Sequence, residues 1–119
     1  MKIDNDKGQK LLKEWKDRLG LQDWKIKLKI NCGQDDIDEN SVGEVEWNET
    51  NQSAMICIGR EEDYGKRVRP YDFEKTLVHE LLHIKTCFLT DTPDETLARV
   101  GHQLIDSLAR ALVDAKRSK

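Results

Sequence analysis

The sequence has no long apolar run, few cysteines and no excess of positive charge. No apolar stretch approaches the roughly 20 residues that a membrane-spanning helix needs, so we expect no membrane association. The three cysteines are odd in number and widely spaced, and they predict no disulfide framework. With 20 basic against 23 acidic residues, the chain lacks the basic footprint of nucleic-acid-binding proteins, and we expect no nucleic-acid partner.

The chain also lacks internal repeats and any low-complexity linker that would divide it. Its 119 residues fit one domain, so residues 1–119 are interpreted as a single unit. The stretch from Met1 to Lys7 lacks the apolar core of a signal peptide, which makes a cytoplasmic location the expectation. A charged fraction of 36% is high, but three tryptophans and several periodic apolar segments indicate a compact core.

The first half of the chain predicts one helix and three strands. Residues 9–19 place leucines and a tryptophan at helical spacing, and Gly20 follows as a stop signal. Residues 24–30 alternate apolar residues with lysine, which indicates a strand with one buried face. An acidic loop is expected over residues 31–41. The two strands expected after it span residues 42–48 and 53–58, and the short connection between them favours a hairpin.

The second half predicts two helices, which makes the fold an α+β domain. Asp72 is a suitable N-cap for a helix that ends near Phe88. After a break, a longer helix is expected from about Asp94 to Asp114, with Thr92 or Asp91 as its N-cap. The residues of this last helix expected to pack on the core are Leu97, Leu104, Leu108, Ala111 and Leu112.

The predicted helix after Asp72 contains the sequence His79-Glu80-Leu81-Leu82-His83, which is an H-E-x-x-H motif. His79 and His83 lie one turn apart on one face, close enough for both imidazoles to bind one ion. Glu80 is rotated by about 100° from His79, so it flanks the metal and can accept a proton from the attacking water. The motif therefore predicts a Zn²⁺ site with Glu80 as the catalytic base. A separate apolar stripe on this helix consists of Phe73, Leu77, Leu81, Ile84 and Phe88.

A catalytic zinc ion usually has three protein ligands and one open position. His102, the only other histidine, is the favoured third ligand, because imidazole is the commonest metal ligand. Glu95 is the alternative, since it precedes His102 by seven residues and points the same way. Asp106 shares a face with His102 and can accept the second ring N–H of a ligating histidine. A thiol, Cys32 or Cys87, could instead occupy the open position of the metal.

The motif and the segment after it resemble a minimal gluzincin, a zinc peptidase with H-E-x-x-H on one helix and its third ligand on a following helix. Thermolysin-type members carry N-E-x-x-x-D on that following helix. The corresponding stretch here is Gly101-His102-Gln103-Leu104-Ile105-Asp106. Asp106 matches the last residue of the pattern, while His102 replaces the ligand glutamate. The resemblance extends to the small minigluzincins and related phage or prophage metallopeptidases, through residues 77–83 and 108–112, and covers the last two thirds of the chain.

The resemblance implies a zinc-dependent metallopeptidase of phage or prophage type that acts on a peptide or protein substrate. It also implies narrow specificity, and latency through chain tails or self-association. An extended substrate would lie along an exposed sheet edge as a further strand. Tyr64, Arg69 and Tyr71 are candidates for stabilising the oxyanion. The alternative function is a catalytically inactive binding module that keeps the peptidase fold and uses zinc for stability alone.

Overall fold

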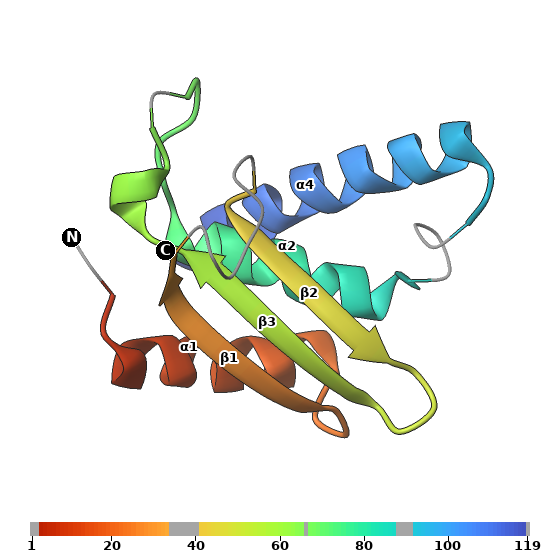
Figure 1. The fold of residues 1–119 in the computed structure, drawn as a ribbon, viewed down its shortest axis with the longest axis horizontal. Coiled ribbons are helices and arrows are strands. Elements are labelled where there is room, and N and C mark those ends of the chain that lie inside the picture. The colour runs from red at the N-terminus through yellow and green to blue at the C-terminus, as the bar shows by residue number, and fades with distance from the viewer. Residues whose placement is uncertain (1–2, 34–40, 66, 88–91, 119) are drawn as a thin grey trace.

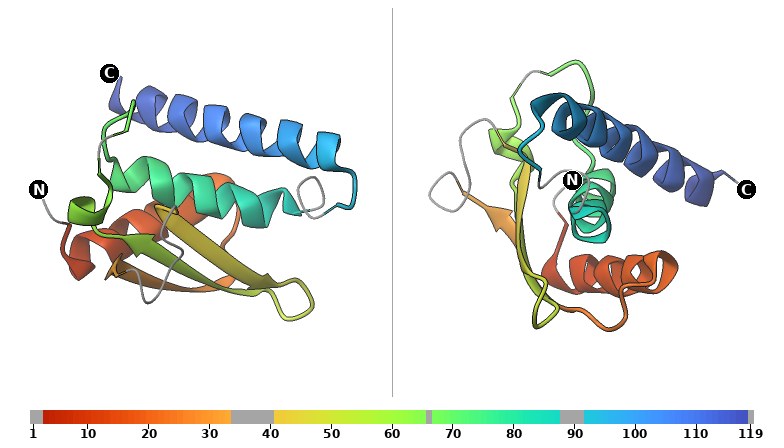
Figure 2. Two further views of the ribbon diagram at one scale, coloured as in Figure 1. Left: turned by 45° about the horizontal axis from the view of Figure 1, so that its top comes forward. Right: turned by 90° about the vertical axis from the view of Figure 1, so that its right-hand side faces the viewer.

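The computed structural model describes residues 3–33, 41–65, 67–87 and 92–118. These residues form the predicted α+β fold, with three α-helices to one side of a three-stranded sheet (Figures 1 and 2). The helices are α1 (Asn5–Leu19), α2 (Phe73–Lys85) and α4 (Glu95–Arg117). The strands are β1 (Lys25–Cys32), β2 (Gly43–Asn48) and β3 (Ser53–Gly59). Among the described helices, none combines the length and the apolar character needed to cross a bilayer.

Helix α1 begins earlier than its apolar spacing indicates. The Asp4 carboxylate caps it by accepting a hydrogen bond from the Lys7 amide at 2.8 Å, so the helix starts at Asn5 rather than at residue 9. Gly20 ends the helix as predicted, in the left-handed conformation with φ of 72°, which glycine adopts without steric cost. On its buried face, Trp15 is 2% exposed and packs in the core.

The sheet has the strand order β1-β3-β2. β2 and β3 form the predicted antiparallel hairpin, while β1 pairs with β3 in parallel. Leu28 of β1 is buried and the lysines on either side of it are exposed, as the alternation predicted. β1 continues through Asn31 and Cys32, so the loop prediction was wrong at these two positions. The part of that loop over residues 34–40 lies outside the described residues.

Helix α2 is the centre of the molecule, because it contacts α1, β2, β3 and α4. Asp72 caps it as predicted and accepts a hydrogen bond from the Lys75 amide at 3.1 Å. The predicted apolar stripe is buried at Phe73, Leu77, Leu81 and Ile84, and Phe88 lies outside the described residues. The sheet and α1 lie on this apolar side of the helix, and α4 lies on the side of His79 and His83 (Figure 2).

Helix α4 buries a different face from the one that the sequence predicted. Leu97, Leu104 and Leu108 are 45%, 53% and 38% exposed, and Ala111 is exposed as well. Leu112 is half-buried and packs against the core, as predicted. The residues buried on α4 are instead Gly101, Ile105, Ala109 and Val113. This second stripe also recurs every four residues, so helical periodicity alone did not identify the buried side.

The N-cap residue of α4 also differs from the predicted one. Asp94 caps the helix through a hydrogen bond from the Leu97 amide at 3.0 Å, and α4 runs on to Arg117. Thr92 accepts a hydrogen bond from the Asp94 amide at 3.3 Å, so it orders the cap but is not the cap. Asp91, the other predicted cap, lies outside the described residues.

The far end of α4 is fixed to the other two helices by a buried carboxylate. Glu74, in the first turn of α2, accepts a hydrogen bond from the Trp15 indole at 2.6 Å and another from the Lys116 ammonium. Arg117 donates to Glu74 at 3.2 Å and to Asp72 at 2.7 Å. The C-terminal turn of α4 is therefore joined to the N-terminal turn of α2, and the two helices lie antiparallel (Figure 2).

Candidate metal centre

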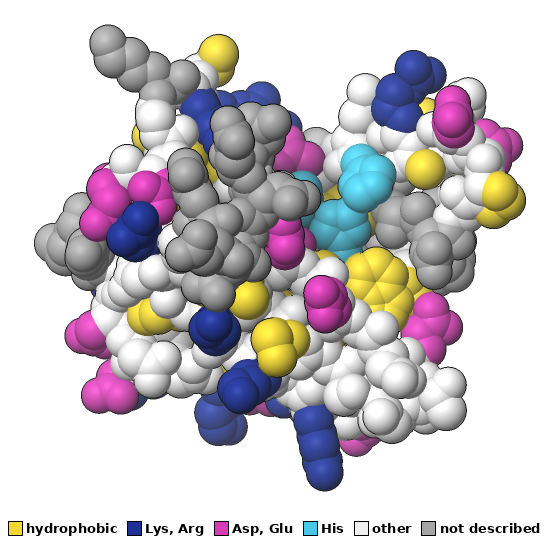
Figure 3. Space-filling view, viewed as in Figure 1, with side chains coloured by type: hydrophobic (Ala, Val, Ile, Leu, Met, Phe, Trp, Pro, Cys, Tyr) yellow, Lys and Arg dark blue, Asp and Glu magenta, His cyan; other side chains and the backbone are white. Residues whose placement is uncertain are grey.

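The antiparallel helices α2 and α4 bring four of the predicted site residues together in facing pairs. His79 Nδ1 lies 3.5 Å from Asp106 Oδ1, and the rings of His83 and His102 have centroids 4.9 Å apart. The two residues on each helix are four apart, or about one turn, so one turn of α2 faces one turn of α4. Figure 3 shows the histidine side chains in a hollow of the surface between α4 and β2.

The two histidines of the motif are close enough to share an ion. Their Nε2 atoms are 3.2 Å apart, and their ring centroids are 4.9 Å apart. Two nitrogens bound at about 2.0–2.1 Å to a tetrahedral zinc ion lie roughly 3.3–3.4 Å from one another. The measured separation of the Nε2 atoms therefore fits a metal ion held by both His79 and His83.

Both histidines are also in the protonation state that binds metals. Burial, together with the neighbouring His79 and His102, lowers the pKa of His83 to about 4. Burial likewise lowers the pKa of His79, against the opposing effect of Asp106. Both shifts favour the neutral imidazole, which is the form that binds a metal ion.

The third ligand position is less fully formed. Among the described residues, no three His, Cys, Asp or Glu side chains are grouped closely enough to hold a metal ion as they stand. His102 is exposed on α4 and contacts the ring of His83. Because it is exposed, its imidazole can change rotamer with little loss of packing. The centre therefore consists of two converging nitrogens with a third imidazole beside them.

The other candidate ligands lie apart from this pair or have partners of their own. Glu95 is exposed in the first turn of α4, and no hydrogen bond or ion pair links it to a histidine in the described part of the chain. Cys87 donates to Glu49 Oε1 at 3.1 Å. Cys32 is buried at the end of β1, with its Sγ 3.5 Å from the Lys29 carbonyl oxygen. Each thiol thus has a hydrogen-bond acceptor.

Glu80 is buried between α2 and the beginning of β2, with 6% of its surface exposed. The backbone of Gly43 lies against its carboxylate, since a Cβ at Gly43 would be 3.1 Å from Glu80 Oε2. Burial, together with the charge of Glu44, raises the pKa of Glu80 to about 8. At pH 7 the carboxyl group is therefore mostly protonated, and a cation bound beside it would favour the carboxylate form that a general base needs.

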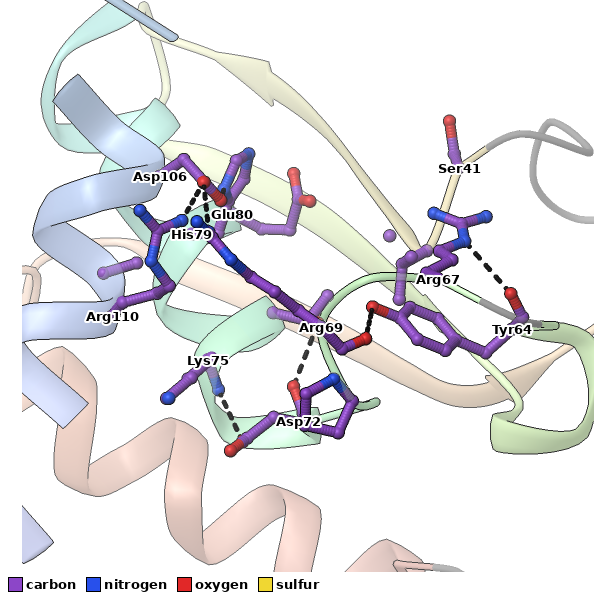
Figure 4. A pocket seen from close by; sticks show the side chains of 15 residues that line it. Ser41, Tyr64, Arg67, Arg69, Asp72, Lys75, His79, Glu80, Asp106 and Arg110 are labelled. Carbon is purple, nitrogen blue, oxygen red and sulfur yellow. Dashed lines mark hydrogen bonds and ion pairs between the residues drawn. The ribbon is translucent and has the colours of Figure 1, made fainter. Parts of the chain in front are cut away.

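Asp106 is held by two arginines from different parts of the chain. Arg110, one turn further along α4, donates a hydrogen bond to Asp106 Oδ2. Arg69 reaches the same oxygen at 3.5 Å from the connection before α2 (Figure 4). The closer contact, with Arg110, fixes the carboxylate that faces His79. The sequence analysis did not identify Arg110, although its four-residue spacing from Asp106 is the signal of such a pair.

A cavity of about 500 Å³ opens beside His79 and Glu80. The start of β2, the connection before α2, and helices α2 and α4 form its walls, as Figure 4 shows. Tyr64 and Arg69, two of the three oxyanion candidates, line this cavity. The third, Tyr71, donates its hydroxyl to the Gly59 carbonyl at 2.8 Å, and burial raises its pKa to about 12.

Comparison with protein-family models, curated proteins and solved structures finds no match to this chain. The resemblance to gluzincins therefore stays a prediction from the sequence. The site itself consists of two imidazoles whose nitrogens converge, a buried carboxylate beside them, and a cavity lined by His79 and Glu80.

Proposed function

We propose that this chain is a zinc-dependent metallopeptidase in which His79 and His83 bind Zn²⁺ together with His102. The observation that carries the proposal is the 3.2 Å separation of the two Nε2 atoms next to the buried carboxylate of Glu80. Bound there, Zn²⁺ would supply Lewis-acid activation of the attacking water and the scissile carbonyl. Glu95 remains the alternative third ligand.

The other side chains have roles that follow from their positions. Glu80 accepts a proton from the attacking water and passes it to the leaving amine. Asp106, whose Oδ1 lies 3.5 Å from His79 Nδ1, favours a proton on that nitrogen, which leaves Nε2 unprotonated for the ion. Arg110 in turn holds Asp106 in place, because it donates to the carboxylate oxygen that does not face His79.

The substrate we propose is an extended peptide or protein segment. β2 is an edge strand of the sheet, and its first residue lies against Glu80. A peptide added alongside β2 would gain backbone hydrogen bonds and pass close to the histidines. Narrow specificity, latency, self-association, phage or prophage origin and a cytoplasmic location stay predictions from the sequence.

The test compares the wild-type protein with Glu80→Gln. Zinc-loaded wild type should cleave unstructured protein substrates, lose activity to a chelator and regain it with zinc. Glu80→Gln should retain one zinc per chain and lose turnover by a factor of about 10²–10⁴, the usual contribution of a general base. Metal content is measured by atomic absorption and cleavage by mass spectrometry. Asp23→Asn, which alters an exposed carboxylate in the connection before β1, is the matched control and should change neither property.

Two results would decide against the peptidase. If zinc-loaded wild type cleaved no member of a broad peptide library, the alternative of a zinc-stabilised binding module would replace it. If Glu80→Gln cleaved peptides as fast as wild type, the assignment of the catalytic base would be wrong.

A further inference from the structure

The cavity beside Glu80 extends away from the histidines, along the first half of α2 toward the connection that precedes this helix. His79, Glu80 and Asp106 line one part of it, while Tyr64 and Arg67 line another. In Figure 4 Arg69 lies between these two groups of residues. The volume of the cavity, about 500 Å³, is within the range of sites that bind small molecules. A group bound in this cavity would therefore lie next to the proposed scissile bond.

Cations outnumber carboxylates on the cavity wall, and most of the charges already have partners. The charged lining residues are Arg67, Arg69, Lys75 and Arg110, against Asp72, Glu80 and Asp106. Asp72 binds Arg117, which is not a lining residue, through hydrogen bonds of 2.7 and 3.1 Å. Lys75 pairs with Asp114 at 3.1 Å, and Arg110 pairs with Asp106. The positive charge that remains belongs to Arg67 and Arg69.

Arg67 is held in position without a carboxylate partner among the described residues. Its Nε donates to the Tyr64 carbonyl at 3.0 Å, and its guanidinium carbon lies 4.8 Å from the centre of the Tyr64 ring. Tyr64 is fixed in turn, because its hydroxyl donates to the Arg69 carbonyl at 2.7 Å. Stacking on an aromatic ring orients a guanidinium group and leaves its terminal N–H groups able to bind a planar anion.

Arg69 is bound only loosely. Its contact with Asp106 is 3.5 Å long, beyond the usual hydrogen-bond range, and its side chain is 59% exposed. Asp106 has a closer partner in Arg110, so Arg69 can turn to another anion at little energetic cost. The two arginines are neighbours on one short connection, and both line the cavity.

We propose that Arg67 and Arg69 bind a carboxylate of the substrate in this cavity. The inference rests on the proposed peptidase function and names its substrate class: peptides with a carboxylate close to the scissile bond. Guanidinium groups bind carboxylates through paired, charge-assisted hydrogen bonds, which a neutral amide of the same shape does not form. The carboxylate belongs either to an acidic side chain or to the C-terminus of the peptide, and both sources have the same chemistry.

The experiment measures binding separately from cleavage. Zinc-loaded Glu80→Gln is titrated by calorimetry with blocked decapeptides that carry one Glu, or one Gln in its place, at successive positions. A third set has no acidic side chain but keeps a free C-terminal carboxylate. We expect one register of the Glu series, or the free C-terminus, to bind about five- to tenfold more tightly than its neutral counterpart. The preference should weaken as salt is added.

Arg67→Gln and Arg69→Gln, each added to Glu80→Gln, should remove most of this preference, and the two together should abolish it. Lys27→Gln removes one positive charge from an exposed strand position outside the cavity and should leave the preference intact. Thermal unfolding confirms that each variant is folded. Equal binding of the Glu and Gln peptides in every register, with no effect of the free C-terminus, would overturn the inference.

The same data separate this inference from the proposed function. Wild type that cleaves acidic and neutral peptides equally well would remain a peptidase without the carboxylate site. Preferential binding of acidic peptides by a wild type that cleaves none of them would contradict the peptidase but keep the carboxylate site as a binding site.

Discussion

Gly43, at the start of β2, lies directly against Glu80 of the motif helix. A Cβ at this position would be 3.1 Å from Glu80 Oε2 and 2.9 Å from the methyl carbon of Thr76. Atoms in protein interiors do not pack this closely without displacement, so the strand can approach the helix only because residue 43 has no side chain. The position of the proposed base thus depends on a residue far from it in sequence.

Gly43→Ala should therefore displace Glu80 while leaving the histidines in place. We expect a loss of stability of about 1–3 kcal/mol, as for other overpacked sites, and a loss of turnover of more than about tenfold. Zinc affinity should change by less than about threefold. Denaturant unfolding, peptide cleavage and zinc titration measure the three quantities. Gly33→Ala is the control, because its Cβ would meet only the flexible side chain of Arg60 at 3.7 Å.

The third metal ligand can be identified by zinc titration of two variants. His102→Ala should weaken zinc binding by more than about 100-fold, because it leaves two protein ligands where a stable site has three. Glu95→Ala should leave the affinity unchanged, since Glu95 is exposed and no hydrogen bond or ion pair links it to a histidine among the described residues. The reverse pattern would assign the third ligand to Glu95.

Asp106→Asn tests the contact between Asp106 and His79. Removing the charge that orients a metal-binding histidine costs about 10–100-fold in metal affinity, and we expect a loss in this range. Asp114→Asn alters another aspartate of α4, one that pairs with Lys75, and serves as the control with unchanged zinc affinity. If the two variants bound zinc equally well, Asp106 would have no part in positioning His79.

Stability in acid should depend on Glu74. Burial alone would raise its pKa, but the hydrogen bonds from Lys116 and Trp15 and the nearby positive charges outweigh this effect and leave the pKa lowered. A lowered carboxyl pKa contributes stability that is present above the unfolded-state value, about 4.5, and is lost as the pH falls through the folded-state value. The free energy of unfolding should therefore fall as the solution is acidified below about pH 4.5.

Glu74→Gln should be less stable at pH 7 by about 1–3 kcal/mol and should lose less stability on acidification than wild type. Some pH dependence should remain, because the pKa values of Asp72 and Glu14 are lowered as well. Denaturant unfolding between pH 3 and 7 gives both quantities. If the free energy of unfolding depended on pH in the same way in Glu74→Gln and wild type, the contacts of Glu74 would contribute nothing to stability in acid. Glu46→Gln provides the comparison for an exposed glutamate.

Two adjacent residues of α4 test its rotation. Ile105 is 2% exposed and Leu104 is 53% exposed. Ile105→Ala should reduce the free energy of unfolding by about 2–4 kcal/mol, because it leaves a cavity against α2. Leu104→Ala should change it by less than about 0.5 kcal/mol. Equal losses would mean that α4 presents a different face to the core.

Local signals in the sequence were sufficient for most of the secondary structure and for the motif. Alternation identified β1, turn residues identified the β2–β3 hairpin, and the spacing of His79 and His83 follows from one turn of one helix. The parallel pairing of β1 with β3 was not predicted, because it joins strands that no short turn connects. The rotation of α4 was predicted wrongly, since the helix has two apolar stripes with the same period.

The surroundings of the candidate site could be predicted less well than the motif. The contact of Arg69 with Asp106 requires two segments to be brought together in the folded chain. The burial of Glu80 likewise depends on β2, which is distant in sequence. Such tertiary contacts leave no regular pattern along the chain, whereas an i, i+4 pair on one helix does.

The anchoring of α4 at one end has a mechanical consequence for the metal centre. Arg117 is bound to α2, and His102 lies 15 residues before it, or about 22 Å along the helix axis. Over that distance a rotation of about 5° at the anchor would displace the imidazole by about 2 Å, comparable to a zinc–nitrogen bond. Gly101, Ile105 and Ala109 are buried as well, so their packing has to keep any such rotation small if His102 is to stay within reach of an ion.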